Sequence, residues 1–206
     1  MRVMVQGLGQ PLHVVISGRR EDRPDTLSAL TDEALMTRFG NGDPDAFEAL
    51  YRRHRGRLHR FVQRMTPGDA DEVFQEVWMA VVAGKERYVP SARFITYLFT
   101  IAHYRAAARW RARGRAFFDQ LPEDDDLLSD EQPDPLGLAL NAELGRALNE
   151  AIAGLPPAQR EAFLMQAEGG LSLDEIAEAS DTCRETVKSR LRYANRRLRR
   201  ALESWK

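Results

Sequence analysis

Residues 171–202 read LSLDEIAEASDTCRETVKSRLRYANRRLRRAL, and this stretch decides the fold of the C-terminal part of the chain. It predicts a helix, a tight turn near Ser180-Asp181 and a second helix. Ser172 and Glu175 have the spacing of a capping box, in which the serine accepts from a backbone N–H and the glutamate reaches back. The first helix is therefore expected to begin at Ser172.

The second helix of this stretch is crowded with arginine and lysine. Thr182 and Glu185 repeat the capping-box spacing and predict where it begins. Apolar residues recur at helical spacing along it: Val187, Leu191, Ala194, Leu198 and Leu202. Its first turns combine groups that suit base edges with groups that suit phosphates: Arg184, Glu185, Lys188, Ser189 and Arg192. The layout predicts a helix-turn-helix whose second helix lies in the major groove, with a solvated basic hairpin as the alternative.

Charge is segregated along the 206 residues, although the formal net charge is only −1. Residues 182–206 carry nine Lys and Arg against two Asp and Glu, whereas residues 116–145 carry nine Asp and Glu and no Lys or Arg. The positive charges of the C-terminal helix and the negative charges of the middle segment cancel in the net charge, but they lie in different parts of the chain. The near-zero total therefore does not exclude a nucleic-acid partner.

Composition favours a protein of the cytoplasm that binds rather than catalyses. The single cysteine, Cys183, excludes a disulfide framework and a multi-cysteine zinc site, and it fits a reducing compartment. No apolar run reaches membrane-spanning length, and residues 1–27 lack the apolar segment of a signal peptide, so a disordered extension is expected there. Four scattered histidines and the lack of a phosphate loop or nucleophile motif predict no metal, no cofactor and no enzyme activity.

The periodic segments all predict helices, so the expected fold class is all-α. Thr31 is an expected N-cap, Asp43-Pro44-Asp45 opens a second helix that ends at Pro67-Gly68, and two more helices are expected over about 69–83 and 91–113. Residues 28–114 would form a first domain. The proline-containing acidic segment 115–139 is expected to be a flexible linker, and residues 140–206 a second small helical domain.

Four segments occur in an order that resembles the bacterial RNA polymerase sigma factors of the extracytoplasmic function (ECF) group. They are DADEVFQEVWMAV at 69–81, FITYLFTIAHYRAAARWR at 94–111, LPPAQREAFLMQAEGGLSLDEIAE at 155–178 and ETVKSRLRYANRRLR at 185–199. The resemblance covers about residues 28–202. It implies a helical region 2 over 28–114, which binds core polymerase and reads and melts the −10 element. It also implies a region 4 over 140–206, whose helix-turn-helix reads the −35 element.

The resemblance assigns roles to individual residues. The 69–81 helix would dock on the clamp helices of the polymerase's largest subunit through Asp71, Glu72, Gln75 and Glu76. Periodicity alone favours a solvated amphipathic helix here, and it is the resemblance that favours the docking role. The −10 element would be read, and a flipped base caught, by the 94–111 helix and the loop before it, through Tyr88, Ser91, Arg93, Tyr97, His103, Tyr104 and Arg105. The −35 element would be read by Arg184, Glu185, Lys188, Ser189, Arg192 and Arg196.

The sequence departs from the family pattern at several of these positions. Tyr97, His103 and Tyr104 stand where tryptophan, arginine and asparagine are common, so −10 preference could be altered or melting weakened. Asp181 stands in the turn where the family usually has glycine, and aspartate tolerates left-handed geometry less well than glycine, though better than most residues do.

The expected partners are core RNA polymerase, through the clamp helices of the largest subunit and the flap of the second-largest, promoter DNA and an anti-sigma factor. No small-molecule substrate is expected. The rival hypotheses are a stand-alone DNA-binding regulator, which needs neither the 69–81 helix nor the aromatic and basic 94–111 helix, and a sigma paralogue that melts DNA poorly.

Overall fold

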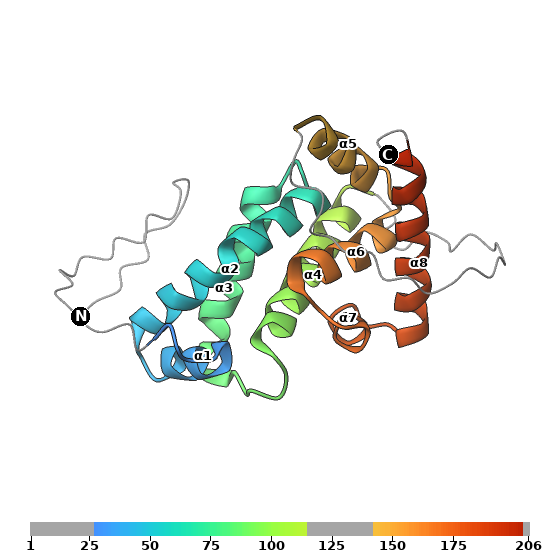
Figure 1. The fold of residues 1–206 in the computed structure, drawn as a ribbon. Helices are drawn as coiled ribbons and strands as arrows, with labels where there is room; N and C mark the ends of the chain where they lie inside the picture. Colours follow the sequence, from blue (N-terminus) through green and yellow to red (C-terminus); the bar gives the residue numbers. More distant parts are fainter. Residues whose placement is uncertain (1–26, 115–141, 204–206) are drawn as a thin grey trace.

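The computed structural model describes residues 27–114 and 142–203. In these two ranges the chain forms eight α-helices and one short 3₁₀ helix, with no β-strand, as the all-α prediction requires (Figure 1). The helices of the first range are α1 Asp32–Gly40, α2 Pro44–Met65, α3 Ala70–Gly84, the 3₁₀ helix η1 Lys85–Arg87 and α4 Phe94–Ala112. Those of the second range are α5 Ala142–Ala153, α6 Pro157–Gly169, α7 Leu173–Ala179 and α8 Arg184–Ala201.

The first two helices begin where the sequence predicts. The Thr31 side chain accepts a hydrogen bond from the Ala34 N–H at 3.3 Å, and the Asp43 carboxylate accepts from the Asp45 N–H at 3.1 Å. Pro44 occupies the first position of α2, where its missing N–H costs nothing. The predicted start of α1 at Thr31 and of α2 at Asp43 is therefore confirmed.

The start of α4 differs from the prediction. It begins at Phe94 rather than near Ser91, because the Ser91 N–H closes a tight turn onto the Val89 carbonyl at 2.8 Å. The first helical N–H, that of Phe94, is capped at 2.8 Å by the Glu33 carboxylate of α1. Because Glu33 is 61 residues away in the sequence, the residues around Phe94 could not predict this cap.

The core is built from the apolar sides of helices in both ranges. Its largest fully buried side chains include Phe61 of α2 and Phe94 and Phe99 of α4. Phe61 and Phe99 meet edge to face with ring centroids 5.0 Å apart. Such a pairing adds about 0.5–1.5 kcal/mol beyond the area it buries.

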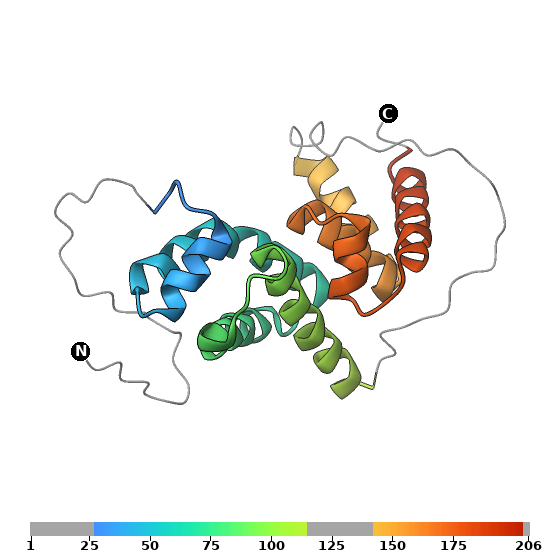
Figure 2. The same ribbon diagram turned by 90° about the horizontal axis from the view of Figure 1, so that it is seen from below.

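The two halves of the described chain pack directly on each other. α6 lies against α2 and α4, and α7 lies against α4, as both views show (Figures 1 and 2). One continuous hydrophobic cluster runs through residues of both halves. The predicted domain bounds remain predictions. The expected acidic linker 115–139 lies outside the described residues, and so does the expected N-terminal extension 1–27 except for Leu27.

Two further findings concern only the ranges 27–114 and 142–203. No helix there is long and apolar enough to cross a lipid bilayer. Nor does that part of the chain bring together three or more His, Cys, Asp or Glu side chains that could hold a metal ion.

Candidate nucleic-acid and polymerase interface

The first surface of interest is the helix-turn-helix formed by α7 and α8. The predicted capping box at Ser172 is confirmed, since the Glu175 N–H donates to Ser172 Oγ at 3.3 Å and the Ser172 N–H donates to the Glu175 carboxylate at 2.9 Å. Asp181 adopts a φ of +48°, so this residue takes the left-handed conformation although it is not a glycine. This geometry directs α8 away from α7 at the turn.

The second predicted capping box, between Thr182 and Glu185, is wrong. The N-cap of α8 is Cys183, in extended conformation and without a side-chain cap. The Thr182 N–H instead bonds to the Ala177 carbonyl at 3.0 Å and closes the end of α7. Thr182 therefore belongs to the turn, one residue too early to cap the next helix.

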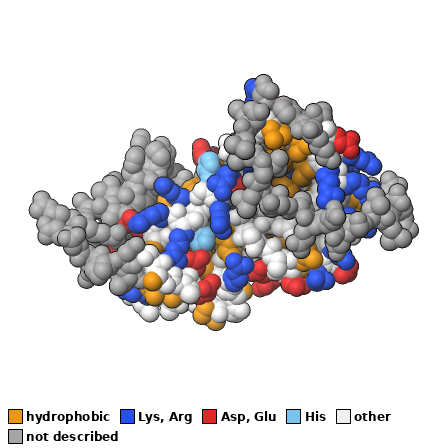
Figure 3. Space-filling model, in the orientation of Figure 1, with side chains coloured by type: hydrophobic (Ala, Val, Ile, Leu, Met, Phe, Trp, Pro, Cys, Tyr) orange, Lys and Arg blue, Asp and Glu red, His pale blue; other side chains and the backbone are white. Residues whose placement is uncertain are grey.

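The exposed side of α8 carries most of the predicted base-reading residues. Val187, Leu191, Ala194 and Leu198 are buried against α6 and α7, which turns the opposite side outward. Arg184, Glu185, Lys188 and Arg192 are exposed, while Ser189 and Arg196 are half-buried. Lys and Arg side chains gather over α8 on the right of the space-filling view (Figure 3).

Two contacts hold side chains of this surface in place. The Arg184 guanidinium pairs with Asp174 of α7 at 3.1 Å, across the helix-turn-helix. The guanidinium groups of Arg192 and Arg196 lie 5.1 and 5.4 Å from the centroid of the Tyr193 ring. Cation–π contacts of this kind orient a charge without removing it from solvent.

Cys183 is exposed at the start of α8. Hydrogen bonds from the Thr186 side chain and nearby backbone N–H groups lower the pKa of its thiol.

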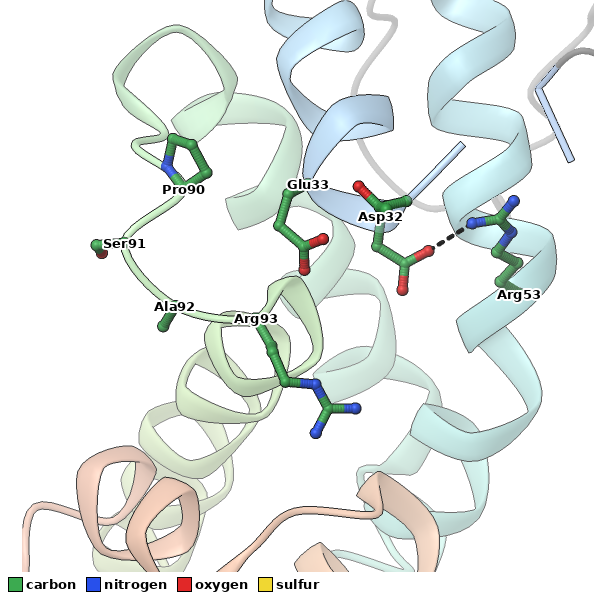
Figure 4. A pocket seen from close by; sticks show the side chains of 8 residues that line it. Asp32, Glu33, Arg53, Pro90, Ser91, Ala92 and Arg93 are labelled. Carbon is green, nitrogen blue, oxygen red and sulfur yellow. Dashed lines mark hydrogen bonds and ion pairs between the residues drawn. The ribbon is translucent and has the colours of Figure 1, made fainter. Parts of the chain in front are cut away.

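The second surface is a cavity of about 500 Å³ at the loop before α4 (Figure 4). Pro90, Ser91, Ala92 and Arg93 form one wall, and Asp32 and Glu33 of α1 with Arg53 of α2 form the other. The figure shows the loop and α1 facing each other across the opening. Of the predicted −10 residues, Ser91 and Arg93 line this cavity and are exposed.

Charged groups on the α1 side of the cavity are fixed by their partners. Asp32 accepts from Arg53 at 2.8 Å and lies 2.7 Å from His54 Nε2. Burial raises the pKa of Asp32, but the hydrogen bonds from His54 and Arg53 outweigh it, and the net pKa is lowered. Asp32 is thus a carboxylate whose two oxygens already have partners.

Tyr88 and Tyr97 do not line the cavity but pack against neighbouring rings beside it. Tyr88 packs edge-on against Tyr97 and Phe94, with ring centroids 5.3 and 6.4 Å away. Burial, with a smaller contribution from Glu33, raises the pKa of Tyr88 to about 12. Burial also raises the pKa of Tyr97.

The remaining predicted −10 residues lie farther along α4 and differ in accessibility. Tyr104 and Arg105 are exposed, whereas His103 is buried and only 3% exposed. His103 Nδ1 lies 2.6 Å from the Glu161 carboxylate of α6. His103 therefore lies in the buried contact between α4 and α6, whereas its neighbours Tyr104 and Arg105 are exposed to solvent.

The third surface is the exposed side of α3. Asp71, Glu72 and Gln75 face outward, whereas Glu76 accepts a hydrogen bond from Arg109 of α4. That bond, with the nearby Glu72 carboxylate 3.1 Å from Arg109, raises the pKa of the guanidinium. Met79 and Val82 continue the row of Gln75 at helical spacing, and their exposed fractions are 53% and 41%.

Sequence reasoning missed several members of these surfaces. Met79 and Val82 could have been found as apolar residues on the side of α3 opposite Val73 and Val77. Glu33 and Arg53 had no such signal, because only the packing of α1 and α2 brings them to the loop before α4.

Together, the all-helical fold, the helix-turn-helix of α7 and α8 and the basic exposed side of α8 are those of a helix-turn-helix protein. Two family models match the chain: Sigma-70 region 2 over residues 50–116 and Sigma-70 region 4 over residues 145–203.

Curated relatives agree with this assignment. The chain is 34% identical to RNA polymerase sigma factor CarQ of Myxococcus xanthus over 143 residues, which are 68% of this chain and 80% of CarQ. It is 30% identical to the ECF RNA polymerase sigma-E factor of Escherichia coli strain K12 over 174 residues, 79% of this chain and 89% of that protein. A match to ECF RNA polymerase sigma factor SigE of Mycolicibacterium smegmatis, 31% identical over 156 residues, spans 75% of this chain but only 60% of SigE.

Two solved structures share the fold. CnrH in complex with the cytosolic domain of CnrY matches with a TM-score of 0.60 and 21% identity, covering 84% of this chain and 97% of CnrH. The sigma factor RpoE, in complex with the anti-sigma factor NepR from Bartonella quintana, matches with a TM-score of 0.59 and 22% identity, covering 76% and 96%.

The chain belongs to the ECF group of RNA polymerase sigma factors. Its function is promoter-specific initiation of transcription with core RNA polymerase. Sigma factors are transcription regulators rather than enzymes.

Proposed function

We propose that each of the three surfaces has a different binding role in a sigma factor. Region 2 here denotes the described residues 27–114, and region 4 denotes the described residues 142–203. The exposed side of α8 would read the −35 element, the cavity and α4 the −10 element, and the exposed side of α3 would dock on core polymerase. The observation that carries this proposal is the row formed by Gln75, Met79 and Val82, because neighbouring exposed apolar side chains on one helix suit a protein partner better than they suit DNA.

The −10 assignment rests on the chemistry of the cavity wall. A base that has left the stack needs a polar recess, and the phosphate beside it needs a cation. The loop of Pro90–Arg93 offers the Ser91 hydroxyl and the Arg93 guanidinium at the mouth of a recess of about 500 Å³. Tyr104 and Arg105, exposed on α4, provide a ring and a charge for the next nucleotides of a single strand.

The −35 assignment rests on the row Arg184, Glu185, Lys188 and Arg192. These residues recur at helical spacing on the outward side of α8, as the recognition helix of a helix-turn-helix requires. Ser189 and Arg196 lie at the edge of this row, where contacts to phosphates are the more suitable role.

Further partners follow from the family. Region 4 would bind the flap of the polymerase's second-largest subunit, and an anti-sigma factor would hold the protein inactive, as the solved neighbours bound to CnrY and NepR suggest. The protein would work in the cytoplasm, on the nucleoid when bound to polymerase. It would carry out no catalysis and need no cofactor, since polymerase forms the phosphodiester bonds.

Selection of promoter DNA from a random library tests these assignments. Holoenzyme assembled from this chain and core polymerase should enrich DNA with two separate conserved blocks. The Arg184→Ala variant should relax only the upstream block, and the Arg93→Ala variant only the downstream block. Relaxation of both blocks by either variant would contradict the division of work between α8 and the cavity.

A further inference from the structure

Two arginines on the outward side of α8 share one aromatic ring. Arg192 and Arg196 lie four residues apart, about one helical turn, and we call them the arginine pair. Their guanidinium carbons lie 5.1 and 5.4 Å from the ring centroid of Tyr193. An N–H of Arg192 also donates to the Tyr193 hydroxyl at 3.4 Å. The proposed function gives Tyr193 no role.

The ring is more restricted in conformation than the two charges it contacts. Tyr193 is half-buried, whereas Arg192 is exposed. An arginine side chain has many rotamers in solvent, while a tyrosine ring is held by only two side-chain torsions. Contact with the ring therefore limits the conformations that both guanidinium groups can adopt.

The arginine pair keeps its positive charge. In the part of the chain that the structure describes, no carboxylate forms an ion pair with either guanidinium, whereas Arg184 of the same helix pairs with Asp174 at 3.1 Å. Two like charges one turn apart on a helix repel each other. The ring face attracts both cations without neutralising them. The contact thus keeps positive charge in a fixed place, where an anionic ligand could bind it.

The position of the pair along α8 favours the DNA backbone as this ligand. In a helix-turn-helix, residues near the start of the recognition helix contact the base edges. Arg192 follows Arg184 by eight residues, about 12 Å along the helix axis at 1.5 Å per residue. The pair therefore lies beyond the first turns of α8, where contacts to phosphates would hold the helix in its register on the duplex.

We infer that Tyr193 is a positioning residue that holds the arginine pair as a preformed clamp for phosphate groups of the −35 DNA backbone. Arg192, which the proposed function places in the base-reading row, then binds the backbone together with Arg196. The choice of DNA as the ligand rests on the proposed function. The contact between the ring and the two guanidinium groups does not.

The clamp should contribute to affinity, because guanidinium groups that are already ordered lose less freedom when DNA binds. Tyr193→Leu removes the ring but keeps a helix-forming apolar side chain. Holoenzyme with this variant should bind promoter DNA about two- to fivefold more weakly, the range expected for an exposed cation–π contact. Tyr193→Phe keeps the ring face and should restore the affinity to within about twofold of the native value.

Dependence on salt distinguishes positioning from general packing. Tyr193→Leu removes no charge, so a change in packing alone would leave the slope of log affinity against log salt concentration unchanged. Release of the arginine pair from the backbone should reduce the size of this slope by up to about 1.8, since each of two phosphate contacts contributes about 0.9. The R192Q/R196Q variant gives the slope without the pair.

A double-mutant cycle shows whether Tyr193 acts through the arginine pair. Tyr193→Leu is introduced into the native chain and into R192Q/R196Q, and each holoenzyme is titrated by fluorescence anisotropy. One duplex carries the selected −35 sequence, and a second duplex carries a scrambled one. Tyr193→Leu should weaken binding equally on both duplexes in the native background, and should have no effect without the arginine pair.

NMR of the free chain reports the contact without DNA or polymerase. The ring should shift the side-chain proton resonances of Arg192 and Arg196 in the native chain and in Tyr193→Phe. The shift should be lost in Tyr193→Leu. Thermal unfolding verifies that each variant is folded, and Tyr193→Gln, which also lacks a ring, replaces the leucine variant if that one unfolds.

The expected result is a salt-dependent loss of affinity in Tyr193→Leu, equal on both duplexes, that Tyr193→Phe restores. An equal loss with and without the arginine pair would overturn the inference, as would unchanged arginine resonances in Tyr193→Leu. A loss confined to the selected duplex would overturn the assignment to phosphates. If the native holoenzyme did not prefer the selected duplex, only the −35 assignment of the proposed function would fail, because the cycle on the scrambled duplex still tests the clamp.

Discussion

Glu76 of α3 accepts a hydrogen bond from Arg109 of α4, so its carboxylate lies against its own domain. Gln75, the next residue toward the N-terminus, faces solvent. The sequence motif places both residues at the polymerase surface, but the structure gives them different environments. Glu76 helps to hold α3 on α4, and Gln75 is free to contact a partner.

The first prediction separates these two roles. Gln75→Ala should weaken binding of core polymerase by about 1 kcal/mol or more, roughly fivefold in Kd, without changing the unfolding midpoint. Glu76→Gln should lower the free energy of unfolding by up to about 1 kcal/mol, because it removes the ion pair with Arg109. Competition binding and urea unfolding measure the two effects, with Arg57→Ala on α2 as the control. Loss of polymerase binding by Glu76→Gln at unchanged stability would reverse the assignment.

The second prediction concerns the reading surface of α8. Arg184→Ala or Lys188→Ala should weaken binding to a selected −35 sequence by about 1–3 kcal/mol if the lost contact is to a base edge. Arg200→Ala, at the far end of the same helix, is a control with the same loss of charge. Titrations on the selected and on a scrambled duplex distinguish the mechanisms, because a phosphate contact would be lost equally on both.

The third prediction tests the turn of the helix-turn-helix. Asp181 has a φ of +48°, a region that β-branched residues strongly disfavour. Asp181→Val should therefore destabilise the protein by about 1–2 kcal/mol, whereas Asp181→Gly should be nearly neutral. Thermal unfolding of the two variants provides the comparison. Equal stability of the valine and glycine variants would show that the turn is not left-handed at this residue.

The fourth prediction is a pH dependence at the cavity wall. The folded protein lowers the pKa of Asp32 below its ordinary value of 3.8, so the carboxylate contributes stability above that pH and loses it as the pH falls through the folded pKa. Asp32→Asn should cost about 1–3 kcal/mol at pH 7, since it weakens the bonds with Arg53 and His54. The difference from the native chain should shrink below pH 3.8. Urea unfolding from about pH 7 to about pH 3 measures it, and Asp71→Asn, at a carboxylate that is 99% exposed, should show no such change.

Local sequence predicts those parts of the fold that depend on neighbouring residues. The capping box of Ser172 and Glu175 is of this kind, because it forms within one helical turn. The Thr182 capping box fails because the end of α7 captures the Thr182 N–H first. Whether Thr182 ends α7 or caps α8 depends on the backbone geometry of the turn, and the spacing of residues in the sequence does not predict that geometry.

The candidate site was only partly predictable for a related reason. Ser91 and Arg93 belong to a recognisable loop, but Glu33 reaches the same place from α1 and caps α4 there. Glu161 and Glu175 belong to helices of the second half and meet the first half only through packing. Contacts that join distant segments carry no periodicity, so sequence patterns could not place them.

The most direct test of the central claim is transcription in vitro with purified core polymerase, this chain and a genomic DNA library, followed by mapping of the 5′ ends. A sigma factor of this kind should give discrete start sites that core polymerase alone does not give. Those start sites should share one upstream and one nearer conserved block, and Arg184→Ala should redistribute them. Start sites indistinguishable from those of core polymerase alone would contradict the account.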